Sequence, residues 1–171
     1  MQVRIASADP INVPGEIQVK GDNVFLGYFK NEDATKEVFT DDGWFRTGDM
    51  GVLDSDGSLF IKGRTKCMIL GPSGQNIYPE EIETTINSQP YVVDSLVIED
   101  NGGLTALIYP DFAQGAKDGM DQESFVKYME GTLAELNAEL PNYAKLKKIE
   151  VMSEDFERTP KKSIKRYLYQ R

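Results

Sequence analysis

The chain of 171 residues contains no histidine, and this absence limits its chemistry. Without imidazole, Ser-His-Asp and Cys-His nucleophile systems and histidine-ligated metal sites are excluded. Any acid–base chemistry must then use carboxylates and lysines. The single cysteine, Cys67, excludes an internal disulfide and a cysteine-rich zinc site. We therefore expect a reducing, cytosolic compartment and no metal held by these residues.

Long apolar runs and an excess of basic residues are also missing. No segment approaches the roughly 20 apolar residues that a membrane-spanning helix needs, and the first residues lack the apolar core of a signal peptide. The formal net charge of -9 repels nucleic acid and anionic lipid at long range. We expect a cytoplasmic protein with no transmembrane segment and no nucleic-acid partner, and peripheral contact with a membrane stays open.

The charge is unevenly distributed along the chain. Residues 145–171 carry nine positive and four negative side chains, whereas the rest of the chain is strongly acidic. One interpretation is a solvated lysine face, and the other is a segment that meets a phosphate or carboxylate group.

The first 63 residues predict mainly β structure. Residues 15–21 alternate apolar and polar side chains between glycines, as a half-buried strand does. A short helix is expected after Asn31, which can accept hydrogen bonds from the free amides of its first turn. Residues 54–57 form a loop of Asp and Gly that suits a hairpin. So few short elements bury little apolar area, which predicts a larger body upstream.

Residues 64–171 predict a mixture of helices and strands. We expect a short strand at 67–70, a helix from Pro79, a hairpin pairing 92–98 with 104–109, one amphipathic helix over 121–139, and a third strand at 147–151. The fold class is α+β: an incomplete β-rich subdomain at residues 1–63, followed by a small α+β domain at residues 64–171 with a three-stranded sheet and helices.

Three short motifs stand out because of their order. They are GWFRTGD at residues 43–49, GRTK at 63–66 followed by GQNIYPEEIE at 74–83, and TPKKSIKR at 159–166. Together with GEIQVKG at 15–21, they make the chain resemble the adenylate-forming enzymes, namely acyl-CoA synthetases, firefly luciferase and the adenylation domains of nonribosomal peptide synthesis. The last motif is most similar to that of the long-chain fatty acyl-CoA synthetases.

The resemblance implies a nucleotide site at Asp49 and Arg64. Asp49 matches the aspartate that binds the two ribose hydroxyls of the adenylate, because a carboxylate can accept from two adjacent hydroxyls at once. Arg64 matches the arginine that reaches the ribose and phosphate, a task that suits its planar fork of donors. The alternatives are a turn carboxylate and a surface ion pair.

The resemblance also implies a moving small domain. Lys66 matches the hinge at which that domain swings between two half-reactions, and the alternative is an ordinary exposed lysine. Gly74 matches the loop glycine that lines the pantetheine tunnel of CoA, and the alternative is a turn glycine that needs positive φ. We interpret Glu81 and Glu83, on the helix after Pro79, as structural.

Lys165 matches the catalytic lysine of the resembled family. Its ammonium is expected to offset the negative charge that develops when the substrate carboxylate attacks the α-phosphate. Lys161 and Lys162 are nearby competitors for this role, and Lys162 is the second candidate. The motif departs from the family pattern at Ile164, where glycine is usual, and at Thr159, where proline is common.

The phosphate-binding loop and the segment that holds adenine and Mg2+ in this family are absent from the chain. We therefore expect the C-terminal part of an acid–thiol ligase, packed on an N-terminal large domain and inactive alone. The whole enzyme is expected to convert a long-chain fatty acid, with ATP and CoA, to acyl-AMP and then acyl-CoA. The alternatives are an adenylation domain that loads a carrier protein and a catalytically silent interaction module with the same fold.

Overall fold

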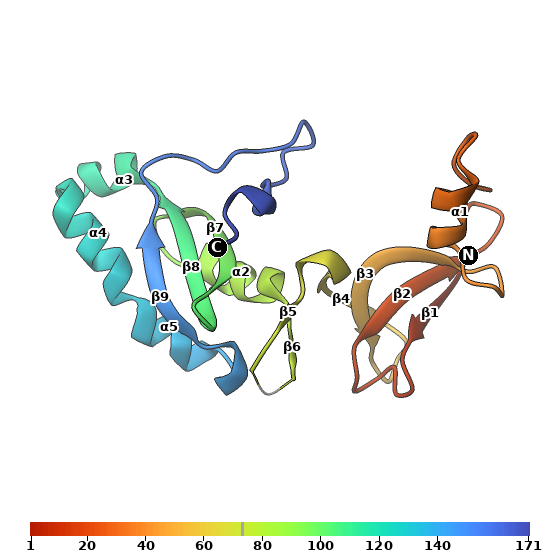
Figure 1. The fold of residues 1–171 in the computed structure, drawn as a ribbon. Coiled ribbons are helices and arrows are strands. Elements are labelled where there is room, and N and C mark those ends of the chain that lie inside the picture. Colours follow the sequence, from red (N-terminus) through yellow and green to blue (C-terminus); the bar gives the residue numbers. More distant parts are fainter. Residues whose placement is uncertain (73) are drawn as a thin grey trace. The chain divides into compact units, whose positions relative to one another are not determined.

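The computed structural model describes residues 1–72 and 74–171, which divide into two compact units. The first unit is Met1–Met68 and the second is Ile69–Arg171. Figure 1 shows sheets in both units, and helices gathered mainly in the second. Among the described residues, no helix is long and apolar enough to cross a bilayer. The expected fold class, a β-rich part followed by an α+β part with a three-stranded sheet, is confirmed.

The first unit is built on a four-stranded antiparallel sheet in the order β1-β2-β3-β4. Its elements are β1 (Gln2–Ala6), β2 (Gly15–Lys20), α1 (Glu32–Val38), β3 (Phe45–Leu53) and β4 (Leu59–Arg64), with a 3-10 turn at Thr65–Cys67. Asn31 caps α1 as expected, because its side chain accepts from the amide of Ala34 at 3.1 Å. The β3–β4 connection is the expected hairpin.

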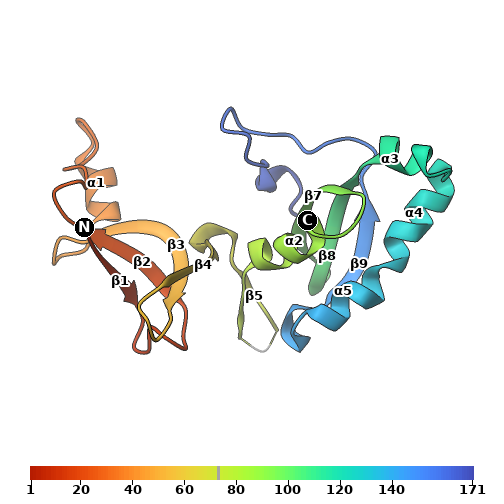
Figure 2. The ribbon, with the colours of Figure 1, turned by 180° about the vertical axis from the view of Figure 1, so that it is seen from behind.

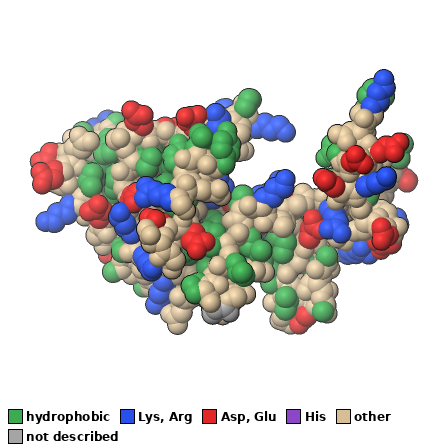
Figure 3. Space-filling model, in the orientation of Figure 1, with side chains coloured by type: hydrophobic (Ala, Val, Ile, Leu, Met, Phe, Trp, Pro, Cys, Tyr) green, Lys and Arg blue, Asp and Glu red, His purple; other side chains and the backbone are tan. Residues whose placement is uncertain are grey.

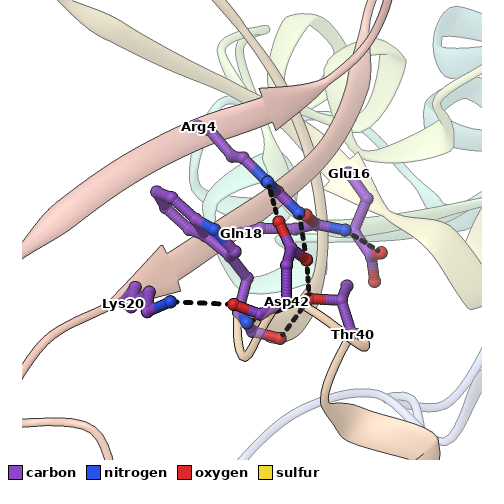
Figure 4. A network of polar contacts seen from close by, with 7 residues as sticks. Arg4, Glu16, Gln18, Lys20, Thr40 and Asp42 are labelled. Atoms are coloured by element: carbon purple, nitrogen blue, oxygen red, sulfur yellow. Dashed lines mark hydrogen bonds and ion pairs between the residues drawn. The ribbon is translucent and has the colours of Figure 1, made fainter.

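A polar network on Asp42 holds β1 and β2 to the loop before β3 (Figure 4). The guanidinium of Arg4 donates to both carboxylate oxygens of Asp42, at 2.6 and 3.1 Å. Lys20 Nζ donates to the Asp42 carbonyl at 2.8 Å, and Thr40 Oγ1 donates to the carboxylate at 2.6 Å. The hydrogen bonds from Arg4, the largest cause, and from Thr40 hold the pKa of the Asp42 carboxyl far below its ordinary value.

The second unit is a three-stranded sheet with helices against one face. Its elements are β5 (Ile69–Leu70), β6 (Asn76–Ile77), α2 (Pro79–Asn87), β7 (Val92–Asp100), β8 (Gly103–Pro110), α3 (Phe112–Lys117), α4 (Gln122–Gly131), α5 (Leu133–Glu139) and β9 (Leu146–Val151), with 3-10 turns at Asn142–Ala144 and Arg166–Leu168. β7 pairs antiparallel with β8, and β9 joins β8 in parallel. Parallel pairing requires a long crossover, which the helices between β8 and β9 supply.

The main core lies between this sheet and the helices. Ile82 and Ile86 of α2, Phe125 and Met129 of α4, and Leu136 of α5 are buried there. The residues after β9 cross the opposite face, where Phe156 joins a second buried cluster (Figures 1 and 2). The sheet is therefore covered on both faces.

The helical segment after Asp121 differs from its prediction. The sequence predicts one helix over 121–139, but the structure has α4 and α5, which are separated at Thr132. The Thr132 hydroxyl donates to the carbonyl of Met129 at 2.7 Å and replaces a continuing helical contact. The short α3 was not predicted. The strand expected from Cys67 is confined to Ile69–Leu70, because Cys67 lies in the 3-10 turn.

Candidate functional site

The structure brings Asp49 and Arg64 together on neighbouring strands. They are direct partners in the antiparallel register of β3 and β4, and Arg64 Nε lies 3.1 Å from Asp49 Oδ1. The side chains remain 31% exposed for Asp49 and 60% exposed for Arg64, so both groups are accessible from solvent. The first unit thus presents a carboxylate and a guanidinium at one position.

A local turn positions Asp49. Gly48 has φ +73°, a conformation that L side chains rarely adopt. Thr47 Oγ1 donates to the carbonyl of Ile17 on β2 at 2.8 Å and accepts from the Asp49 amide at 3.1 Å. Thr47 therefore ties the turn to the neighbouring strand β2 and fixes the position of the Asp49 backbone, from which the carboxylate extends.

Lys66 lies in the 3-10 turn after β4 and is exposed. The first compact unit ends two residues later, at Met68. The predicted hinge residue therefore lies close to the boundary between the compact units. The division of the chain at residues 63 and 64 stays a prediction.

Gly74 lies in the loop between β5 and β6, with φ +78°. Its amide donates to the Gly71 carbonyl at 2.9 Å, and the Gly71 amide donates to the Gln75 carbonyl at 2.8 Å. No atom of a described residue lies within 4 Å of where a Cβ of Gly74 would be. The turn therefore needs glycine for its backbone conformation, and the space beside it is open.

A groove of about 420 Å³ lies next to this loop within the second unit. Gly71 and Pro72 line it from the loop, and Leu70 and Tyr143 give it exposed apolar surface. Lys145, Lys147 and Glu99 also line the groove, so two positive charges and one negative charge border the apolar surface. The groove combines features that suit a ligand with an apolar or flexible arm and an anionic group. The groove was not predicted from the sequence, because its walls come from segments far apart in the chain.

Lys165 lies on one arm of a small hairpin formed by the C-terminal segment. Arg158 bridges Ile164 antiparallel, and Thr159 N donates to the Ser163 carbonyl at 2.8 Å. Lys165 N donates to the Glu157 carbonyl at 2.8 Å. The turn of the hairpin therefore holds Lys162, whose φ is +64°.

The ammonium of Lys165 lies against a carboxylate. Its Nζ is 3.0 Å from Glu157 Oε2, and the lysine side chain is 30% exposed. The hydrogen bond with Glu157 raises the pKa of Lys165 above its ordinary value, so the group is positively charged at neutral pH. The sequence analysis did not single out Glu157, because only the hairpin brings this acid to the lysine.

Glu83 and Arg166 form a second pair beside Lys165. Arg166 Nη2 donates to Glu83 Oε2, and Glu83 Oε1 accepts from the amide of Val97 at 2.7 Å. Glu83 therefore joins α2 to β7 and to the C-terminal segment, whereas the expected role at the helix end does not apply to it because it lies beyond the first turn of α2.

Residues 68–171 match the family described as AMP-binding enzyme C-terminal domain. The chain belongs to this family. AMP-binding enzyme C-terminal domains are part of the adenylate-forming superfamily that the motifs predict, and the match covers the second unit with its Gly74 loop and the Lys165 hairpin.

Relatives of this AMP-binding enzyme C-terminal domain are CoA ligases for different acids. The chain is 31% identical to the long-chain-fatty-acid–CoA ligase FadD15 of Mycobacterium tuberculosis over 172 residues, which is 89% of the chain and 28% of the ligase. It is 48% identical over 89 residues to a 2-succinylbenzoate–CoA ligase of Bacillus cytotoxicus, covering 52% of the chain and 18% of that protein. The chain thus spans less than a third of these curated relatives.

The crystal structure of ATP-bound MatB from Rhodopseudomonas palustris is also similar. It matches 98% of this chain and 33% of the MatB chain, with 32% identity and a TM-score of 0.74. The similarity therefore includes the β-rich first unit as well as the AMP-binding enzyme C-terminal domain. The resemblance seen in the motifs is confirmed at the level of the superfamily, while the relatives do not single out a long-chain fatty acid.

A cluster of metal ligands is not found among the described residues. No group of three or more Asp, Glu, Cys or His side chains converges among them as a metal ion would need.

Proposed function

We propose that this chain is the C-terminal part of an ATP-dependent acid–thiol ligase. The whole enzyme joins a carboxylic acid to AMP with release of pyrophosphate, and then transfers the acyl group to CoA. The family match over residues 68–171 carries this proposal, and the similarity to complete CoA ligases over both units supports it. In this view residues 1–63 belong to the large domain, residues 64–171 are the small domain, and the Mg2+ is held by the large domain.

Asp49 and Arg64 are proposed to hold the ribose end of the nucleotide. The Asp49 carboxylate accepts hydrogen bonds from the two ribose hydroxyls. Arg64, whose Nε lies 3.1 Å from that carboxylate, directs its remaining N–H donors to the ribose and phosphate. The antiparallel pairing of the two residues supports a shared role.

Lys165 is proposed to act in the first half-reaction. A carboxylate oxygen of the acid bonds to the α-phosphorus, while the bond to the β-phosphate oxygen breaks and pyrophosphate leaves. The lysine keeps its proton and lies between the two anions, where its charge offsets the developing negative charge. Its raised pKa, caused by Glu157, supports an ammonium rather than a general base.

Gly74 and the neighbouring groove are proposed to serve the second half-reaction. The open space at Gly74 accommodates the thiol arm of CoA, and the lysine-bordered groove suits the anionic part of CoA. Lys66 is proposed as the hinge at which the small domain rotates between the two half-reactions. The nearby unit boundary at Met68 supports this proposal.

A long-chain fatty acid is proposed as the substrate, in a cytoplasmic enzyme. The similarity to FadD15 over 89% of the chain supports this choice, as does the TPKKSIKR motif. The substrate is tested by measuring thioester formation by the whole protein with acids of increasing chain length and with 2-succinylbenzoate. Greater turnover of 2-succinylbenzoate or of short acids would contradict it.

Separate assays of the two half-reactions test the site. In the whole protein, Lys165→Ala is expected to lower the rate of adenylate formation by about 10²- to 10³-fold, the typical effect of removing one positioned donor. It leaves thioester formation from supplied acyl-AMP unchanged. Gly74→Leu is expected to have the opposite effect. Lys162→Ala is the matched control, and a larger loss in that variant would move the catalytic role to Lys162.

A further inference from the structure

A buried carboxylate in α2 reaches the segment that carries Lys165. Glu83 is only 7% exposed, although its helix neighbours Ile82 and Ile86 belong to the apolar core. One of its oxygens accepts from the Val97 amide of β7 at 2.7 Å, and the other pairs with Arg166. Three elements that are distant in sequence therefore meet at one carboxylate.

The partners of this carboxylate only partly offset the effect of its burial, so its pKa lies above the ordinary value. Burial raises the pKa of Glu83, whereas the hydrogen bond and charge of Arg166 and the Val97 amide act in the opposite direction. A buried ion pair adds little net stability over apolar packing, but removal of one partner leaves an uncompensated buried charge. Such a pair is therefore better suited to fix a geometry than to stabilise the fold.

The geometry that the pair fixes is that of the Lys165 backbone. Arg166 is the next residue in the chain and begins the 3-10 turn Arg166–Leu168. Within this turn Leu168 N donates to the Lys165 carbonyl at 3.0 Å, while Lys165 N donates to the Glu157 carbonyl at 2.8 Å. Lys165 is thus held on both sides of its Cα, and its side chain remains partly exposed.

We propose that Glu83, through Arg166, is a positioning residue that sets where the Lys165 ammonium is delivered during adenylate formation. The inference rests on the proposed function of Lys165. Glu83 touches no substrate in this view and acts only by holding Arg166. Because α2 follows directly on the hairpin that carries Gly74, the same helix braces the segments assigned to both half-reactions.

Two substitutions in the whole protein test the proposal. Glu83→Gln keeps the side-chain shape and an acceptor for Val97 but removes the charge, and Arg166→Lys keeps a charge but removes the planar fork. Each is expected to lower kcat for adenylate formation by about 10- to 100-fold, as displacement of a reacting group by about 1 Å does. The KM values for ATP and acid, and thioester formation from acyl-AMP, stay unchanged.

Arg171→Lys is the matched control. Arg171 also joins the C-terminal segment to two carboxylates, Glu150 at 2.7 Å and Asp100 at 3.4 Å, but it lies six residues beyond Lys165. Its substitution is expected to leave both half-reactions within two-fold. Hydrogen exchange on the same proteins checks the physical step: Glu83→Gln speeds exchange of the Leu168 amide and leaves the β8 amides protected.

Measuring Glu83→Gln in a Lys165→Ala background distinguishes failure of this inference from failure of the proposed role of Lys165. If Glu83 acts through Lys165, Glu83→Gln costs less than two-fold in that background. A full additional loss there overturns the inference and leaves the function of Lys165 intact. Activity of Glu83→Gln and Arg166→Lys equal to that of the control overturns it as well. If Lys165→Ala itself has no effect, the proposed role of Lys165 fails and this inference fails with it. If Glu83→Gln does not fold, Arg166→Lys alone decides by the same criteria.

Discussion

Adding one methyl group at Gly115 tests the packing of the aromatic core in the second unit. Gly115 is buried in α3, and a Cβ built there would lie 2.8 Å from two ring carbons of Phe125. The ring cannot move freely, because Tyr91 and Phe112 pack against it with ring centroids 5.4 and 5.5 Å away. Gly115→Ala is therefore expected to overpack this core.

The size of the effect follows from two opposing contributions. Extra volume in a packed core costs about 1–3 kcal/mol, whereas alanine in place of glycine in a helix gains about 0.8–1 kcal/mol. Gly131, at the end of α4, supplies the matched control because, apart from its own helix and chain neighbours, no atom of the described residues lies within 4 Å of its added Cβ. Gly131→Ala is expected to stabilise by about 0.5–1 kcal/mol. The difference between the two variants isolates the clash, at about 1–3 kcal/mol.

Two optical signals report the two units separately in thermal unfolding. Of the described α-helices, only α1 lies in the first unit, so the circular dichroism of helix follows mainly the second. The single tryptophan, Trp44, lies in the first unit and serves as an internal control. A difference of 1 kcal/mol corresponds to about 4–8 °C in a domain of this size.

The midpoint for Gly115→Ala is therefore expected at least about 4 °C below that of Gly131→Ala, with an unchanged Trp44 transition. Equal midpoints for the two alanine variants would refute the reasoning, because the Phe125 ring would then have moved aside with no loss of stability.

Acid titrations of the same unfolding transitions test two ion pairs. Arg171, followed by Lys148, lowers the pKa of Glu150 from 4.5 to about 2, so these contacts stabilise the fold above about pH 4.5 and lose their effect as the pH falls towards 2. Arg171→Ala is expected to flatten the loss of stability of the second unit between those pH values, and an unchanged slope would contradict the contact. Arg4 depresses the pKa of Asp42 in the first unit, so Asp42→Asn is expected to reduce stability at neutral pH but to make little difference at strongly acidic pH. Trp44 fluorescence measures this, and a stability loss that is independent of pH would argue against the ion pair.

The local elements were predictable because their signals are local. Asn31 caps α1, Pro79 begins α2, and glycine lies at the turns where φ is positive. The break between α4 and α5 was not predicted, because the apolar spacing continues through Thr132. Gly131, a poor helix former, ends α4, and both the amide and the hydroxyl of Thr132 donate to the Met129 carbonyl. The parallel placement of β9 beside β8 likewise depends on tertiary packing rather than on its own six residues.

The candidate site divides in the same way. Asp49 and Arg64 are 15 positions apart in sequence, yet a hairpin register makes them partners, so a motif and a predicted turn together indicate their contact. Glu83 and Arg166 are separated by 83 residues, and no pattern in either segment connects them. Such a pair becomes visible only when the C-terminal segment folds back across the sheet.

That fold-back also explains the uneven charge of the sequence. Three arginines of the basic C-terminal segment each meet two carboxylates: Arg158 with Asp94 and Asp155, Arg166 with Glu80 and Glu83, and Arg171 with Asp100 and Glu150. Positive and negative side chains accordingly lie side by side over the second unit (Figure 3). Arginine suits these contacts because its planar fork can serve two acceptors at once. Lys161 and Lys162 lie exposed in the hairpin turn. The three arginines thus bind the C-terminal segment to carboxylates of the second unit, whereas the two lysines are exposed to solvent. The uneven charge therefore includes both a segment that meets carboxylates and a solvated lysine face.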